Sequence, residues 1–78
     1  MKLSEAKKGD RLRFESFAEE FQYKSILSGV GLTEGDCIQV IASSFLGSPI
    51  TIQLENGELF GLRKNEAAKI NVKRGKAK

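Results

Sequence analysis

The apolar residues of this chain follow two different spacings, and the change between them divides the chain into elements. Over residues 11–15, Leu12 and Phe14 alternate with polar residues, which predicts a strand with one buried face. Between residues 16 and 31, apolar residues recur three or four positions apart, which predicts an amphipathic helix of about three to four turns. Beyond this helix the alternation returns. The pattern therefore predicts one strand, one helix and then a run of strands.

Both ends of the expected helix carry recognisable signals. Ser16 and Glu19 fit a capping box, in which the serine oxygen accepts a hydrogen bond from the N3 amide and the glutamate reaches back to the cap amide. At the other end, Gly31 can take the left-handed conformation that ends a helix. Leu32 can then fold back onto Leu27, as in a Schellman motif.

The remaining strands indicate the fold class. The strand over residues 37–42 is apolar on both faces, which predicts a central position in the sheet. A short closing strand at residues 70–72 follows a turn at residues 65–68. Five short strands with one α-helix between strands 1 and 2 describe a mainly β fold, a small five-stranded SH3-like barrel. We expect residues 1–72 to form this domain and residues 73–78 to form a basic, disordered tail.

Asn56-Gly57 predicts a hairpin, because both residues tolerate the positive φ of a type I′ turn. With a two-residue loop, Leu54 lies opposite Leu59, and Leu62 lies on the other face of the hairpin. Phe60 then also lies on that outer face, where an aromatic side chain can anchor a partner.

The net charge of +3 comes from the end of the chain. Of the 13 basic residues, four lie within residues 73–78, and the other 9 are balanced by 10 acidic residues. A duplex-binding domain is expected to carry a basic face on its folded surface. A nucleic-acid-binding barrel that uses the tail and Phe60 is therefore a weaker alternative, and we expect no nucleic-acid partner.

The residue types present argue against catalysis and against a tight metal site. The chain has no histidine and one cysteine, so no Ser-His or Cys-His pair is possible. Cys37 is expected to be a small buried apolar residue. First-row metals favour imidazole, thiolate or clustered carboxylates, whereas Glu15, Glu19 and Glu20 fit a helix start favoured by the macrodipole. We expect a protein that is not an enzyme, with no tightly bound cofactor and with ferrous iron bound at most weakly.

The chain also lacks the signals of a membrane or secreted protein. No apolar run approaches the roughly 18–20 residues that cross a bilayer, and the polar start lacks the apolar region of a signal peptide. We expect a cytoplasmic protein without membrane insertion, with peripheral association at the inner face of the membrane left open. The oligomeric state is also left open.

Four segments carry a resemblance to a known family when their order and spacing are taken together. They are Leu3-Ser4, Leu32-Thr33-Glu34-Gly35-Asp36, Phe45-Leu46-Gly47-Ser48-Pro49-Ile50 and Gly61-Leu62-Arg63-Lys64-Asn65-Glu66-Ala67. With these segments the chain resembles the ferrous iron transport protein A family, FeoA, over residues 3–72. Glu34 and Ser48 depart from the family pattern, in which proline and aspartate are frequent at these positions.

The resemblance implies a noncatalytic cytoplasmic accessory, or adaptor, of ferrous iron uptake. Its partner would be the FeoB transporter, a membrane protein with a cytoplasmic GTP-binding domain, and docking would use loops and exposed apolar surface. The alternative from another class is a metal-responsive regulatory SH3-like domain that binds a transition metal ion, as in metal-dependent repressors. The chain has no recognition helix for DNA, which disfavours that alternative.

Six residues are candidates for partner binding. They are Tyr23, Phe45, Leu46, Pro49, Phe60 and Arg63. The loop position of the apolar residues at 45, 46 and 49 favours a binding surface, although the first two can plug one end of the barrel and the proline can serve only the turn. Tyr23 is expected to lie half in the core and half at the rim. Arg63 can set the orientation of an acidic partner.

Overall fold

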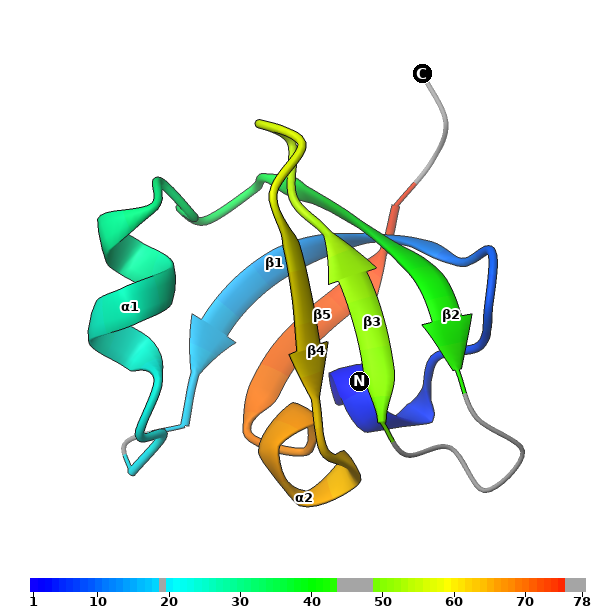
Figure 1. Ribbon diagram of the computed structural model, residues 1–78, viewed down its shortest axis with the longest axis horizontal. Coiled ribbons are helices and arrows are strands. Elements are labelled where there is room, and N and C mark those ends of the chain that lie inside the picture. The colour runs from blue at the N-terminus through cyan, green and yellow to red at the C-terminus, as the bar shows by residue number, and fades with distance from the viewer. Residues whose placement is uncertain (19, 44–48, 76–78) are drawn as a thin grey trace.

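Five strands form a single curved sheet in the computed structural model, which describes residues 1–18, 20–43 and 49–75 (Figure 1). The elements in chain order are η1 (Leu3–Glu5), β1 (Arg11–Phe17), α1 (Lys24–Gly29), β2 (Cys37–Ser43), β3 (Ile50–Gln53), β4 (Leu59–Leu62), α2 (Lys64–Ala67) and β5 (Ile70–Arg74). The strand order is β4-β3-β2-β1-β5, and all neighbouring strands are antiparallel. The prediction that residues 37–42 form a central strand is confirmed.

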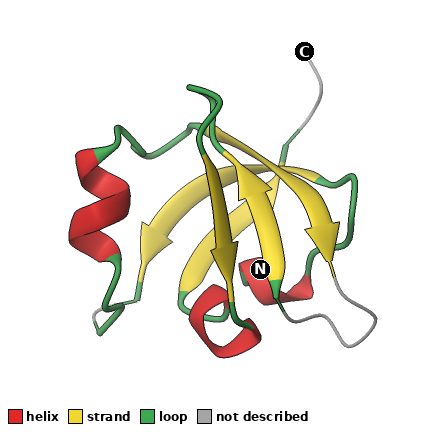
Figure 2. Cartoon of the chain, viewed as in Figure 1, coloured by secondary structure: helices red, strands yellow, loops and turns green. Residues whose placement is uncertain are grey.

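The strands curve around one apolar core, with α1 standing at one side and with α2 and η1 at the lower end in the view of Figure 2. Among the described residues, sixteen apolar side chains are buried. They are Leu3, Ala6, Leu12, Phe14, Phe21, Leu27, Leu32, Ile38, Val40, Ile50, Ile52, Leu54, Leu62, Ala67, Ile70 and Val72. Every element contributes at least one of them, so the core ties the helices to both halves of the sheet.

The curvature has a visible cause in the pairing of the two long strands. β1 shifts register against β5 between Phe14 and Ser16, and β2 shifts register against β3 between Val40 and Ala42. An extra residue in one strand bends it and increases its twist. The first halves of β1 and β2 pair with each other. Their second halves bend around the core, where β1 pairs with β5 and β2 pairs with β3.

A tight turn holds the first end of the β1–β2 pair. The Asp10 N–H donates to the Lys7 carbonyl at 3.0 Å, and the Asp10 carboxylate accepts the Lys7 N–H at 2.9 Å. Gly9, with φ of +93°, donates its N–H to the Val40 carbonyl at 2.8 Å, and the Val40 N–H returns a bond to the Asp10 carbonyl at 2.9 Å. The turn is thus bonded both within itself and to the partner strand.

A turn with the same hydrogen bonds lies at the other end of the β1–β2 pair. The Asp36 N–H donates to the Thr33 carbonyl at 3.0 Å, and the Asp36 carboxylate accepts the Thr33 N–H at 2.9 Å. Gly35, with φ of +92°, donates to the Phe14 carbonyl at 2.8 Å, and the Phe14 N–H donates to the Asp36 carbonyl at 2.8 Å. A local twofold relation centred on the Leu12–Ile38 pair therefore connects the two Gly-Asp turns.

The start of the helix was predicted wrongly. β1 continues through Phe17, with Ser16 opposite Asn71 and Phe17 opposite Ile70, so Ser16 is a strand residue and does not cap a helix. The helix α1 begins only at Lys24 and has six residues in place of the expected three to four turns. Pairing with β5 therefore overrides the local capping signal.

The predicted end of the helix is confirmed. Gly31 has φ of +105°, and its N–H donates to the Ser28 carbonyl at 3.1 Å. The Leu32 N–H donates to the Leu27 carbonyl, also at 3.1 Å. These two bonds define a Schellman motif, and both leucines lie in the core.

The hairpin between β3 and β4 has a longer loop than expected. Leu54 donates its N–H to the Glu58 carbonyl at 2.9 Å, the Gly57 N–H donates to the Leu54 carbonyl at 2.9 Å, and Gly57 has φ of +92°. Three residues therefore lie in the loop, and the register moves by one residue: Gln53 lies opposite Leu59 and Ile52 lies opposite Phe60. The predicted outer-face position of Phe60 and Leu62 is wrong, because both lie on the core side with Ile50 and Ile52.

The end of the sheet also differs from the prediction. Lys73 and Arg74 belong to β5, opposite Arg13 and Leu12, and are not part of a disordered tail. Lys73 lies 3.4 Å from the Glu15 carboxylate, and Arg74 lies 3.6 Å from that of Asp10. Two of the four terminal cations are therefore paired with acidic groups of the folded domain.

In the part of the chain that the structure describes, none of the helices has the length and apolar character needed to span a membrane.

Candidate functional site

An apolar groove of about 190 Å3 lies between α1 and β4. Its walls are formed by Tyr23, Ile26 and Leu27 from the helical side and by Phe60, Gly61 and Leu62 from the strand. Leu27 and Leu62 are buried at its base, whereas Tyr23 and Phe60 are half-buried at its walls. The groove is therefore an opening in the side of the core, lined by aliphatic and aromatic groups.

A row of aromatic rings positions the start of α1. The rings of Phe14 and Phe17 are 4.7 Å apart, those of Phe17 and Phe21 stack at 5.2 Å, and Tyr23 meets Phe21 edge to face at 5.8 Å. Such pairs contribute about 0.5–1.5 kcal/mol each beyond their buried area. The ring of Tyr23 is thereby tied to β1 and kept at the wall of the groove.

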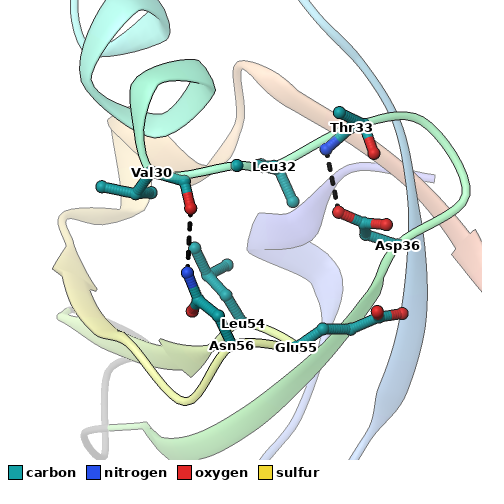
Figure 3. A pocket seen from close by; sticks show the side chains of 8 residues that line it. Val30, Leu32, Thr33, Asp36, Leu54, Glu55 and Asn56 are labelled. Carbon is teal, nitrogen blue, oxygen red and sulfur yellow. Dashed lines mark hydrogen bonds between the residues drawn. The ribbon is translucent and has the colours of Figure 1, made fainter.

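The other end of the helix is tied to the tip of the β3–β4 hairpin. Asn56 donates from Nδ2 to the Val30 carbonyl at 2.8 Å (Figure 3). Its Oδ1 accepts the Glu58 N–H at 2.9 Å. One side chain thus satisfies a carbonyl at the helix end and fixes the hairpin loop. The groove is held open between two anchors, the aromatic row and this amide.

One exposed apolar side chain lies at the rim of the groove. Ile26, which lines the groove, is 53% exposed, whereas Leu59, which is 57% exposed, lies on the opposite face of β4 from Phe60. Among the described residues, Met1 is the only other large apolar residue of this kind. Contiguous exposed apolar surface marks interaction sites more often than isolated exposed residues do. The combination of groove and exposed rim makes this the candidate site.

The structure brings some of the predicted site residues together. Tyr23 and Phe60 stand on opposite walls of the groove. Pro49 and Arg63 are exposed and directly continue the Ile50–Leu62 pair, so they lie at one end of the β3–β4 hairpin. Phe45 and Leu46 lie outside the described residues, so the prediction for them is not tested.

One residue that lines the site, Ile26, is not among the residues predicted from the sequence to bind a partner. The prediction that Leu59 lies opposite Leu54 is also wrong, because the loop has three residues. The signal that could have given the correct register is Gly57, because a glycine in the left-handed region at the end of a three-residue loop shifts the register by one position. No comparable local signal separates Ile26 from its buried neighbour Leu27.

A second, polar hollow of about 400 Å3 lies on the far side of the Asn56 anchor (Figure 3). Asp36 and Glu55 line it, but the Asp36 carboxylate accepts the Thr33 N–H, and Glu55 Oε2 accepts the Cys37 N–H at 2.9 Å. Cys37 itself is half-buried, which differs from the buried position expected for it. Both carboxylates thus serve the backbone of the turn and of β2.

The acidic residues do not form a metal-binding cluster in the described part of the chain. Across residues 1–18, 20–43 and 49–75, no three side chains of histidine, cysteine, aspartate or glutamate lie close enough to hold a metal ion. The arrangement of the candidate site, by contrast, favours contact with an apolar surface.

The family model of the FeoA domain matches residues 1–74 of the chain. The chain belongs to the FeoA family. This match confirms the resemblance found in the sequence. The family is associated with ferrous iron transport. No curated protein matches the chain.

Two solved FeoA structures are similar to this FeoA chain. The solution structure of the FeoA protein from Chlorobium tepidum is 38% identical, with a TM-score of 0.81 over 95% of this chain and 70% of that one. The crystal structure of Stenotrophomonas maltophilia FeoA complexed with zinc, described as a prokaryotic SH3 domain protein, is 25% identical, with a TM-score of 0.77 over 92% of this chain and 88% of that one. The prediction of a mainly β, SH3-like domain is confirmed.

A manganese-dependent transcriptional repressor shares the fold. It is 17% identical, with a TM-score of 0.79 over 95% of this FeoA chain and 36% of the repressor. At this identity the likeness shows a common fold alone. It does not extend the repressor's metal or DNA chemistry to this chain.

Proposed function

We propose that this FeoA domain is a noncatalytic adaptor of ferrous iron uptake that binds the cytoplasmic part of a FeoB-type transporter. The observation that carries the proposal is the apolar groove between α1 and β4 with exposed Ile26 at its rim, in a chain of the FeoA family. When a partner covers an exposed isoleucine beside an open groove, apolar surface is removed from water, which lowers the free energy of the complex. The proposal places the domain in the cytoplasm, at the inner face of the membrane when bound.

The side chains at the groove support an adaptor more than an enzyme. Aliphatic and aromatic groups at its walls can exclude water and bind an apolar surface, but they neither donate nor abstract protons at neutral pH. Tyr23 is the one hydroxyl among the residues that line the groove. Recognition through aromatic and aliphatic anchors is the ordinary chemistry of protein interfaces.

The charge of the domain supports a protein partner over a nucleic acid. Lys73 and Arg74 are engaged with Glu15 and Asp10, so these cations are partly neutralised. Duplex binding depends on cations that neutralise phosphates and so release their counterions. Cations that are already paired with carboxylates do this poorly.

The test is an NMR titration of the isotope-labelled FeoA domain with the cytoplasmic GTP-binding domain of the ferrous transporter from the same organism. We expect shifts at Tyr23, Ile26, Phe60 and Arg63. The variant Ile26→Lys should weaken binding by about tenfold, equivalent to about 1.4 kcal/mol, because a lysine ammonium must be desolvated in the groove.

Ser28→Lys is the matched control. It adds the same charge to the same helix, two residues further on and therefore on the opposite side of α1, at an exposed position. Binding that is unchanged by Ile26→Lys, or weakened equally by Ser28→Lys, would contradict docking at the groove. Absence of any binding to the transporter domain would contradict the adaptor itself.

A further inference from the structure

The two edges of the sheet are treated differently. At β5, the N-terminal ammonium of Met1 donates to the Val72 carbonyl at 2.9 Å, and the Val72 N–H donates to the Met1 carbonyl at 2.8 Å. Lys2 forms a bridge with Asn71 in the same strand. The β5 edge is therefore partly covered by backbone, and its exposed end carries Lys73 and Arg74, which discourage further strand pairing.

The β4 edge has none of these protections among the described residues. Its sequence, Leu59-Phe60-Gly61-Leu62, contains no charge and no proline, and its pairing with β3 runs without a register shift. Natural proteins usually protect an edge of this kind, because it can pair with another strand. An apolar, regular and unpaired edge beside an open groove is the feature that calls for an explanation.

The peptide groups that β4 offers can be identified from the hairpin. Leu54 and Glu58 form a hydrogen-bonded pair, and bonded and non-bonded pairs alternate along an antiparallel ladder. Leu59 and Gly61 therefore direct their N–H and C=O groups away from β3. No hydrogen bond from residues 1–18, 20–43 or 49–75 satisfies these groups, and a methyl group at Gly61 would meet nothing within 4 Å.

The groove next to this edge can receive a side chain of the added strand. An apolar cavity of about 150 Å3 is enough to bind benzene, so the groove of about 190 Å3 accommodates an aliphatic side chain of leucine size. Side chains of a strand added to β4 alternate between the two faces of the sheet, and those on the core side meet the groove between Phe60 and Ile26.

Charge distinguishes the two ends of the groove. Lys24 begins α1 next to Tyr23, and Arg63 follows Leu62, so two cations lie at the end where α1 begins and β4 ends. Neither of these two cations has an ion-pair partner in the described part of the chain. Glu58 lies at the opposite end of β4. An acidic residue of the partner is therefore favoured at the end near Arg63.

We propose that β4 accepts an extended segment of a partner protein as an additional strand, hydrogen-bonded to Leu59 and Gly61. The segment places one aliphatic side chain in the groove between α1 and β4 and an acidic side chain next to Arg63 and Lys24. Strand addition of this kind obtains affinity from main-chain bonds and specificity from the pockets for alternate side chains. The identity of the partner as a transporter rests on the proposed function above.

A second copy of the chain is a poorer occupant than a free segment. If two β4 strands paired, the core-side residues of the added strand would be Phe60 and Leu62 of the second copy. Those side chains already lie in or against their own core, so they cannot also fill the groove of the neighbour. Only a segment whose side chains are free satisfies both the edge and the groove.

The test compares Gly61→Pro with Gly61→Ala. Proline removes the outward N–H without removing a bond to β3, and edge strands tolerate proline at such positions. Alanine keeps the N–H and has room for its methyl group. We expect Gly61→Pro to weaken binding of the transporter's cytoplasmic domain about tenfold, equivalent to about 1.4 kcal/mol, and Gly61→Ala to leave it nearly unchanged.

Hydrogen exchange of the unmodified chain provides a readout that needs no variant. The amides of Leu59 and Gly61 should become protected when the transporter domain binds, while the protection of the amides of Ser25 and Lys69, two exposed residues outside β4, should not change. Binding without this protection, or equal binding by both Gly61 variants, would overturn strand addition and leave the adaptor function standing. Protection of these amides in the free chain together with a dimeric mass would assign the edge to a second copy and overturn the proposal.

A short synthetic peptide separates the two proposals. The peptide has glutamates at one end followed by alternating leucine and threonine, and it is added at millimolar concentration. If the transporter domain does not bind but this peptide protects Leu59 and Gly61, the adaptor function is wrong and the strand-addition site holds. If neither ligand binds, both proposals fail.

Discussion

Two glycines at the end of α1 give opposite predictions for the same substitution. Gly29 is the last residue of the helix and Gly31 follows two positions later with φ of +105°. A methyl group would meet nothing within 4 Å at either position. Steric crowding is therefore absent in both cases, and the backbone conformation alone determines the effect of an alanine.

The magnitudes follow from that difference. Gly29→Ala should stabilise the domain by about 0.5–1 kcal/mol, because alanine loses less conformational entropy in a helix than glycine does. Gly31→Ala should destabilise it by about 1–2 kcal/mol, because an L-residue is strained in the left-handed region. For a domain of this size, 1 kcal/mol shifts Tm by roughly 4–8 °C. We expect Tm to rise by roughly 2–8 °C for Gly29→Ala and to fall by roughly 4–16 °C for Gly31→Ala.

Thermal unfolding followed by circular dichroism measures both shifts under one buffer condition. Gly31→Asn is the control, since asparagine tolerates the left-handed conformation and should lose less stability than alanine. A Gly29→Ala variant that melts below the unmodified chain would refute the reasoning. So would a Gly31→Ala variant that melts together with it.

Three further outcomes follow from the packing and the turns. Asp36→Ala and Asp10→Ala should each lower the free energy of unfolding in urea by about 1 kcal/mol, because each removes the carboxylate that accepts a turn N–H. Asp10→Ala also removes the exposed pair with Arg74, which adds less than about 1 kcal/mol, and an unchanged stability in either variant would contradict the role of these carboxylates. Leu27→Ala, at a fully buried position, should cost about 2–5 kcal/mol and can abolish the cooperative transition, whereas a cost under about 1 kcal/mol would place this leucine outside the core. Lys73→Ala should change stability by less than about 0.5 kcal/mol, because its ion pair with Glu15 is exposed, and a larger loss would show that the strand depends on this pair.

The features that the sequence predicts well depend on local chemistry. The Schellman motif requires a residue that tolerates positive φ followed by an apolar residue, and Gly31 and Leu32 meet both conditions within two positions. The central place of β2 follows from apolar residues on both of its faces, which only a strand with two neighbours can bury. Neither inference needs knowledge of a distant part of the chain.

The start of the helix was mispredicted because its determinant is not local. The segment that contains Ser16 satisfies a capping box in isolation, but Ser16 pairs with Asn71 and Phe17 with Ile70, more than fifty residues further along the chain. Phe17 also stacks between the rings of Phe14 and Phe21. The strand thus gains pairing and aromatic contacts that a cap cannot match.

The hairpin and the candidate site were predicted only in part for a related reason. Asn-Gly fits both a two-residue loop and the end of a three-residue loop, and the two differ by one register position, which exchanges the faces of every residue in β4. Here the Asn56 amide bonds to Val30, and this contact with the helix accompanies the longer loop. Tyr23 and Phe60 were each identified as binding residues, but their position on two walls of one groove depends on where α1 lies against β4.

The paired Gly-Asp turns determine which part of the domain can move independently. They bracket the segment that contains α1, and they fix β1 to β2 through bonds at both ends of the pair. Swinging α1 away from β4 would break the Asn56–Val30 bond and expose Leu27, but it would break no bond between strands. The contacts that hold α1 are thus separate from the bonds that hold the sheet, so a change in the width of the groove would leave the register of the strands intact.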